Sequence, residues 1–145
     1  ASHSSARALT DHSRNLDDEM LLALKGNGGV IQTVAFGTYV SELRRAHWAS
    51  GGDFADAPPA TISDFVDHID YMVDLIGVEH VGISSDFDGG GGLIGWDNAS
   101  ETFNVTSELV RRGYTEEEIE LMWSGNLLRV LDDVQRIAQE IQNEA

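Results

Sequence analysis

The sequence predicts an α/β fold, because two apolar, β-branched runs are separated by a segment with helical periodicity. The first run covers residues 29–36 and the second covers residues 78–85. Runs of this kind are typical of strands that are buried on both faces, as in a parallel sheet covered by helices. The segment between them, residues 61–77, has the apolar spacing of a helix. The order strand, helix, strand predicts one parallel pair joined by a right-handed crossover.

Pattern alone leaves two α/β architectures open, a doubly wound sheet and a (β/α)8 barrel. Two strands cannot close a barrel, so the barrel requires strands from outside these 145 residues. The chain also begins at Ala1 without a methionine. We therefore expect a processed product or a fragment of a longer chain, with residues 1–145 forming part of one domain.

A short helix is predicted before the first strand, over residues 17–25. Asn15 or Asp17 can cap it, acidic residues fill its first turn, and Gly26 or Gly28 can end it. After the first strand, residues 37–60 are rich in glycine, proline and polar side chains. This segment is expected to be a loop, with one or two helical turns between residues 41 and 48.

The clearest helix signal begins at Thr61. Thr61 and Asp64 have the spacing of a capping box, and Gly77 can end the helix. The apolar positions fall on one helical face. They are Ile62, Phe65, Val66, Ile69, Met72, Val73 and Ile76.

The chain after the second strand is expected to be a flexible loop over residues 86–92, followed by helices. One helix is predicted over residues 105–112, and Thr115 opens another. A last helix has an apolar face at helical spacing. Its members are Leu127, Leu128, Leu131, Val134, Ile137, Ala138 and Ile141.

Composition excludes several classes of protein. The formal net charge of −16 would repel a phosphate backbone, so nucleic-acid binding is not expected. No apolar run approaches the roughly 20 residues that a membrane-spanning helix needs. Because the chain has no cysteine, a metal site would have to use His and carboxylate ligands, a set that suits zinc and its first-row neighbours.

Asp86 and Asp88 lie where the second buried run ends. The carboxyl ends of strands in α/β proteins are where catalytic side chains gather, and a carboxylate there can bind metal or act as a general base. The alternative is that an Asp beside glycines caps a turn. Both roles stay open for Asp86, and the turn role is favoured for Asp88. The glycines at 89–92 lack the motif of a phosphate loop and the oxygen ligands of a calcium loop.

Other candidate residues carry less information when they are taken singly. His3 lies in a serine-rich stretch near the N-terminus, where an exposed or hydrogen-bonded imidazole is the ordinary expectation. Arg14, Arg44 and Arg45 are able to pair with a substrate carboxylate, although solvation is the default for a surface arginine.

Taken together, these stretches resemble the renal (membrane) dipeptidase family, zinc-dependent enzymes of the amidohydrolase superfamily. Residues 2–9 with Ser13, Arg14 and Asn15 resemble the segment at that family's sixth strand, and residues 78–89 resemble its eighth strand. Residues 113–119 and 125–130 are similar to its closing helices. The resemblance runs in the right order over nearly the whole chain, and covers the C-terminal part of the family's domain.

The resemblance implies a (β/α)8 barrel with two zinc ions bridged by a Glu. By position, His3 matches a zinc ligand, Arg14 the arginine that binds the substrate's C-terminal carboxylate, and Asp86 the aspartate that moves protons. Tyr39 matches a tyrosine of the substrate pocket. The family's His-x-Asp of strand one, its bridging Glu and its His of strand five have no counterpart in these residues.

The expected activity is therefore the hydrolysis of dipeptides by a zinc-activated hydroxide, in the complete barrel. The present chain alone is expected to be inactive. Its expected partners are a dipeptide substrate and either the remainder of the barrel or another copy of the chain. The alternative function is a non-catalytic α/β scaffold, or a self-associating fragment, whose site residues are vestigial.

Overall fold

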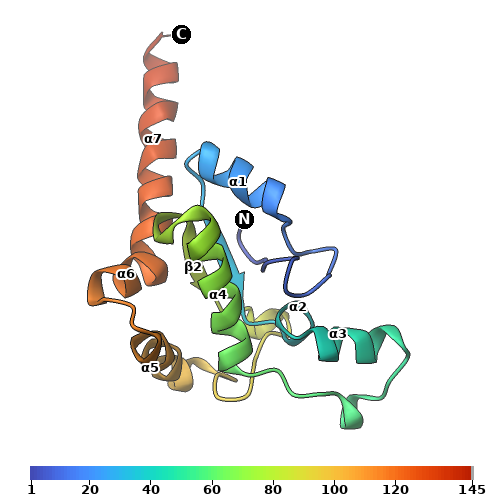
Figure 1. Cartoon of the computed structure of the whole chain (residues 1–145). Helices are drawn as coiled ribbons and strands as arrows, with labels where there is room; N and C mark the ends of the chain where they lie inside the picture. Colours follow the sequence, from blue (N-terminus) through green and yellow to red (C-terminus); the bar gives the residue numbers. More distant parts are fainter. Residues whose placement is uncertain (145) are drawn as a thin grey trace.

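The computed structural model of the chain describes residues 1–144 and shows a small parallel sheet with helices packed around it (Figure 1). Strands β1, Ile31–Val34, and β2, Val81–Ser84, pair in parallel, with Val34 opposite Ser84. On the other edge of β1, the N-terminal segment runs parallel to it and places Ser4 opposite Thr33. The predicted mixed α/β class with parallel strands is confirmed.

Helix α4, Ile62–Ile76, connects the two strands and buries one apolar face in the core. Its predicted capping box is confirmed, since the Thr61 amide donates to Asp64 Oδ2 (2.7 Å) and the Asp64 amide donates to Thr61 Oγ1 (3.3 Å). Gly77 ends it with a φ of 93°, a conformation that favours glycine. The buried side chains of α4 are Phe65, Val66, His68, Ile69, Met72 and Ile76.

The helices that precede α4 begin at residues that cap them. α1 covers Asp18–Gly26 and begins after Asp17, whose carboxylate accepts from the Met20 amide (2.9 Å). The loop after β1 contains α2, Gly37–Val40, α3, Glu42–Ala49, and a 3-10 turn, η1, over Phe54–Asp56. Ser41 caps α3 through the Arg44 amide.

The second strand is shorter than the sequence pattern predicted. Val78–His80 form a 3-10 turn, η2, and only Val81–Ser84 pair with β1. The Val78 carbonyl is used within this turn, since it accepts from the Val81 amide. Asn126 Nδ2 on the C-terminal helix also donates to the carbonyls of Val78 (2.7 Å) and Val81 (2.9 Å).

The C-terminal third is helical after two 3-10 turns, η3 over Phe87–Gly89 and η4 over Ala99–Glu101. α5 covers Thr102–Arg112, and a second capping box, from Thr115 and Glu118, opens α6, Glu116–Glu120. A π-helical turn, η5, Leu121–Gly125, joins α6 to α7, Asn126–Glu144. Figure 1 shows α7 extending well beyond the other elements.

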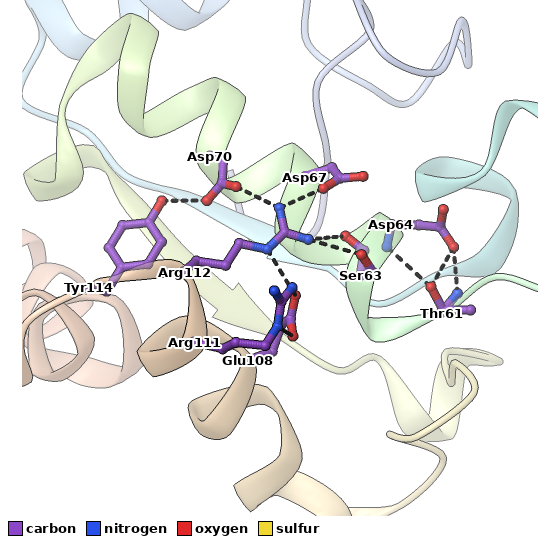
Figure 2. A network of polar contacts seen from close by, with 9 residues as sticks. All are labelled: Thr61, Ser63, Asp64, Asp67, Asp70, Glu108, Arg111, Arg112 and Tyr114. Atoms are coloured by element: carbon purple, nitrogen blue, oxygen red, sulfur yellow. Dashed lines mark hydrogen bonds and ion pairs between the residues drawn. The ribbon is translucent and has the colours of Figure 1, made fainter.

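Arg112 fastens α5 to α4 (Figure 2). Its guanidinium donates to Asp67 Oδ1 (2.5 Å) and Asp70 Oδ2 (2.6 Å) on α4 and to Glu108 Oε1 (2.9 Å) on α5. Burial alone would lower the pKa of Arg112, but the hydrogen bonds that its guanidinium donates to these carboxylates raise the pKa well above its ordinary value. The Tyr114 hydroxyl adds a bond to Asp70 (2.8 Å).

The predicted apolar face of the last helix exists, and about half of its surface is exposed in the described chain. Six of its large apolar side chains are between 46% and 63% exposed. They are Leu127, Leu128, Leu131, Val134, Ile137 and Ile141. No helix among residues 1–144 has the length and hydropathy needed to cross a lipid bilayer.

Candidate active site

The N-terminal segment places His3 and Arg14 in contact. The Ser4 amide donates to the Gln32 carbonyl (3.2 Å) and the Val34 amide donates to the Ser4 carbonyl (3.1 Å), which fixes the segment along β1. Arg14 Nη2 lies 2.8 Å from His3 Nε2. A guanidinium has no acceptor, so Nε2 accepts this bond, and Nδ1 carries the hydrogen that points at Ser2 Oγ (2.8 Å).

The loop that carries Arg14 is held from inside by Asn15, which is buried. Its side-chain oxygen accepts from the Ser5 amide (3.1 Å), and its amide nitrogen donates to the carbonyls of Thr10 (3.0 Å) and Tyr39 (2.8 Å). Asn15 was considered as a helix cap from the sequence, and Asp17 has that role instead. The buried Asn15 side chain thus couples the position of Arg14 to that of Tyr39.

Tyr39 lies on α2, directly after β1, and its ring packs between two others. The centroid of the His12 ring is 4.2 Å from that of Tyr39, and the Phe36 centroid is 4.7 Å away. Sequence reasoning missed His12, although its position two residues before Arg14 was a usable signal. Burial, followed by the charges of Arg45 and Arg14, lowers the pKa of His12 below its ordinary value.

Asp86 follows β2 by two residues and has a left-handed backbone, with φ 54° and ψ 32°. Among the described residues that are not glycine, no other has a positive φ. A Cβ on Gly89 would overlap the Asp86 carboxylate, and a Cβ on Gly91 would overlap the Ser85 carbonyl. The glycine run is therefore required by close packing around Asp86, and its amides at 89 and 91 donate to the Asp86 carbonyl (2.9 and 2.7 Å).

The four predicted site residues follow one edge of the sheet. His3 and Arg14 are in direct contact, and His12 links Arg14 to Tyr39, since the Arg14 amide donates to His12 Nδ1 (3.1 Å). Asp86 is on the neighbouring strand end and is not joined to the other three by a hydrogen bond. None of the four residues lines any of three cavities in the described chain, of about 690, 600 and 360 Å³. The barrel that the resemblance implies predicts that His3 and Asp86 face one pocket, and this stays a prediction.

A metal site is not complete within residues 1–144. No group of three or more His, Cys, Asp or Glu side chains in that part of the chain is arranged to hold an ion. His3 offers one imidazole and Asp86 one carboxylate, but zinc in proteins generally takes three or four protein ligands. The described residues therefore do not by themselves fit the binuclear site that the sequence resemblance implies.

The chain matches one known protein family over its whole length. Residues 1–145 match the profile of the membrane dipeptidases, peptidase family M19, from end to end. The chain belongs to this family. The chain is 38% identical over 141 residues to Dipeptidase aclJ of Aspergillus oryzae, and 40% identical over 144 residues to Dipeptidase ataJ of Aspergillus terreus. These matches cover 97% and 99% of this chain but 31% and 32% of the relatives, so the chain spans about a third of their length.

Solved structures of similar proteins support the membership. The probable dipeptidase PvdM of Pseudomonas aeruginosa is 36% identical, with a TM-score of 0.81 over 92% of this chain and 44% of that one. A metallopeptidase of Rhodobacter sphaeroides, liganded with a phosphinate mimic of the dipeptide L-Ala-D-Ala, is 25% identical, with a TM-score of 0.76 over 90% of this chain and 34% of that one. The chain thus has the fold of part of these larger proteins.

Proposed function

We propose that this chain forms the C-terminal part of a (β/α)8 barrel and that the complete protein is a zinc-dependent dipeptidase. The observation that carries the proposal is the contact between His3 and Arg14 (2.8 Å) at an edge where three parallel segments lie side by side. Membership of a dipeptidase family and a relative liganded with a dipeptide mimic support the substrate class.

In this proposal the remaining metal ligands come from barrel strands outside the chain, and His3 contributes one of the donors. Zinc, when bound, supplies a water that is deprotonated near neutral pH. The lone pair of His3 Nε2 is engaged by Arg14 in this structure. If His3 Nε2 held a metal, Arg14 could not keep this hydrogen bond, and its guanidinium would be available to a carboxylate.

Arg14 and Asp86 have separate roles in the proposed reaction. Arg14 binds the C-terminal carboxylate of the dipeptide in a bidentate, charge-assisted pair. Asp86 holds the proton that passes to the leaving amine nitrogen, a role that suits a carboxylate at the end of a barrel strand. The ring of Tyr39 lies against that of His12, and in this proposal Tyr39 would form one side of the pocket that takes the substrate carboxylate.

Arg14→Ala in the intact protein tests the proposal. Loss of the guanidinium leaves the substrate carboxylate unpaired, at a cost of about 2–5 kcal/mol, so kcat/KM for free dipeptides should fall by at least ~30-fold. Dipeptide amides should lose far less. Zinc content should stay at the wild-type level, and Arg111→Ala, an exposed arginine on α5, serves as the control.

The rival function, a non-catalytic scaffold, makes the opposite prediction. An intact protein that binds no zinc and cleaves no dipeptide would support the scaffold and overturn the enzyme. Equal activity of Arg14→Ala and wild type on free dipeptides would remove the proposed carboxylate site. The 145-residue chain by itself should be inactive in either case, because its described residues lack a complete set of metal ligands.

A further inference from the structure

A cleft of about 690 Å³ lies between α3 and the loop that follows β2. It is lined by Arg44 and Trp48 of α3 and, from the loop, by Gly90 and residues 92–95. Ala60 and Leu93, which are buried, line it as well. We call this space the α3 cleft. None of its lining residues has a role in the proposed reaction.

The walls of the α3 cleft are held in place by backbone hydrogen bonds. The Gly92 amide donates to the Ala35 carbonyl (2.8 Å), and the Ile94 amide donates to the Ala60 carbonyl (2.9 Å). Gly95 has a φ of 94°, and a Cβ there would lie 2.9 Å from Ile62 Cδ1. Glycine at this position lets the loop approach α4 closely. The cleft is therefore a formed feature of the fold.

Two large apolar side chains are exposed at this cleft. Ile94 is 64% exposed and Trp48 is 40% exposed, and both line the cleft. Exposed apolar side chains that converge on a concave surface are typical of ligand-binding grooves. The charged residues that line the cleft are Asp97, Glu101 and Arg44, so its lining has a net negative charge. That charge disfavours a ligand with an acidic side chain.

The α3 cleft adjoins the candidate active site. Phe36 lines the cleft, and its ring packs against Tyr39 with the centroids 4.7 Å apart. Gly90 and Gly92, which also line the cleft, belong to the loop that begins at Asp86. A ligand held between Tyr39 and Asp86 would therefore have the α3 cleft next to it.

We propose that the α3 cleft binds a large apolar side chain, aromatic or branched, of the dipeptide. The assignment rests on the proposed dipeptidase function and adds a preference for one class of dipeptide. Trp48 and Ile94 contact this side chain, and the glycine-lined wall gives it room. An apolar pocket of this kind typically discriminates between side chains by tenfold or more.

The test uses the intact protein and the variants Trp48→Ala and Ile94→Ala. Leu43→Ala, on the same helix as Trp48, and Phe103→Ala are the matched controls, because both side chains are about three-quarters exposed and neither lines the cleft. Alanyl-phenylalanine and phenylalanyl-alanine are compared with alanyl-alanine. Two quantities are measured: kcat/KM, and equilibrium binding by calorimetry after the metal has been removed by chelation.

Wild type should prefer one of the phenylalanine dipeptides over alanyl-alanine by about tenfold in both measurements. Trp48→Ala and Ile94→Ala should reduce this preference to about twofold or less, and the two controls should retain it. The assignment is overturned if wild type shows no preference or if the cleft variants keep it. If no dipeptide is cleaved but the binding preference follows the cleft variants, the proposed activity fails and the cleft assignment stands.

Discussion

At the scale of single residues, Asp86 has the least favourable backbone of the candidate site. A left-handed conformation costs an ordinary L-residue about 1–2 kcal/mol, and Asp somewhat less. Sparsely populated backbone conformations that persist in a fold are often associated with function. Here the conformation lies two residues after a buried strand, at the position where a catalytic carboxylate was predicted.

Asp86→Gly should therefore separate stability from activity. Glycine removes the left-handed cost but adds about 0.5–1 kcal/mol of backbone entropy, so the free energy of unfolding should equal that of wild type or exceed it by up to about 1 kcal/mol. Asp86→Ala should lower it by about 1 kcal/mol, and both variants should lose dipeptidase activity. Denaturant unfolding checks the stabilities, with Asp88→Ala in the same loop as the control. A clear loss of stability in Asp86→Gly would contradict the argument.

His68 is the second residue with a testable consequence. It is 1% exposed on α4, its Nδ1 accepts from the Ala6 amide (3.0 Å), and its Nε2 lies 3.4 Å from Thr10 Oγ1. Burial lowers the pKa of His68 to about 4. A hydrogen bond with the Val40 backbone and the negative charge of Asp67 raise this pKa by smaller amounts. An amide only donates, so protonation of Nδ1 would break the bond that holds the N-terminal segment.

The pH dependence follows from the sign of this shift. Above pH 6.5 the imidazole is neutral in both the folded and unfolded chains, and the full stability is present. Below that value the unfolded chain takes up a proton that the folded chain rejects, so stability falls until the pH approaches 4. Between pH 7 and pH 4.5 the loss should be about 2–3 kcal/mol.

His68→Gln is the matched variant, because its side-chain oxygen can accept from the Ala6 amide without titrating. Its free energy of unfolding should depend much less on pH in this range, as measured by denaturant unfolding at several pH values. Equal pH dependence in wild type and His68→Gln would show that other groups dominate.

At the scale of elements, the Arg112 cluster in Figure 2 joins α5 to α4 through side chains that are separated by more than 40 residues in sequence. The Arg112 side chain is 15% exposed, but its partners Asp67 and Asp70 are 56% and 36% exposed. Removal of the Arg112 guanidinium should therefore lower the free energy of unfolding less than the breaking of a fully buried ion pair would.

Arg112→Ala should lower the free energy of unfolding by about 2 kcal/mol, because it leaves several carboxylates without their shared partner. Arg111→Ala is the neighbouring control. Its side chain is 66% exposed and pairs with Glu108 alone, so the change should cost less than about 0.5 kcal/mol. Denaturant unfolding measures the free energy of unfolding of both variants. Equal losses in the two would mean that Arg112 stabilises the fold no more than an ordinary surface arginine.

The elements that the sequence predicted well are those whose signals are local. The capping box at Thr61 and the apolar spacing of α4 depend on neighbouring residues, and the helix was found at its predicted bounds. The second strand was predicted too long, because the apolar pattern does not distinguish a 3-10 turn at Val78–His80 from a strand, and Asn126, which bonds the Val78 carbonyl, is distant in sequence. The π-helical turn at Leu121–Gly125 was missed altogether, since α-helical and π-helical periodicities are too close to separate over five residues.

The candidate site likewise contains features that the sequence indicates and features that depend on the tertiary structure. His3, Arg14 and Tyr39 were assigned to the site through resemblance to a family, because their residue types alone did not distinguish them from surface groups. Asp86 was a candidate already from its position at the end of a buried strand, although that position left a turn role equally open. The contact between His3 and Arg14, the packing of His12 on Tyr39 and the buried Asn15 depend on tertiary structure. No periodicity or spacing in the sequence encodes these contacts.

At the scale of the whole molecule, the chain exposes more surface than its size requires. Its accessible surface is 8023 Å², whereas a compact protein of 15.8 kDa is expected to expose about 7300 Å². The apolar face of α7 accounts for part of the excess. In a barrel, the outer helices bury such faces against neighbouring strands and helices. The proposed complete barrel would therefore cover α7 with chain that lies outside these residues.

Leu131→Glu tests whether α7 is covered in the intact protein. If it is, a charge enters an apolar contact and the burial of one leucine is lost, so the free energy of unfolding should fall by at least about 2 kcal/mol. Gln135→Glu, on an exposed position of the same helix, should change it by less than about 0.5 kcal/mol. The 145-residue chain alone should self-associate as its concentration rises in light scattering, and Leu131→Glu should weaken that association. An intact protein that tolerates Leu131→Glu, together with a 145-residue chain that stays monomeric, would mean that the apolar face of α7 is not an interface.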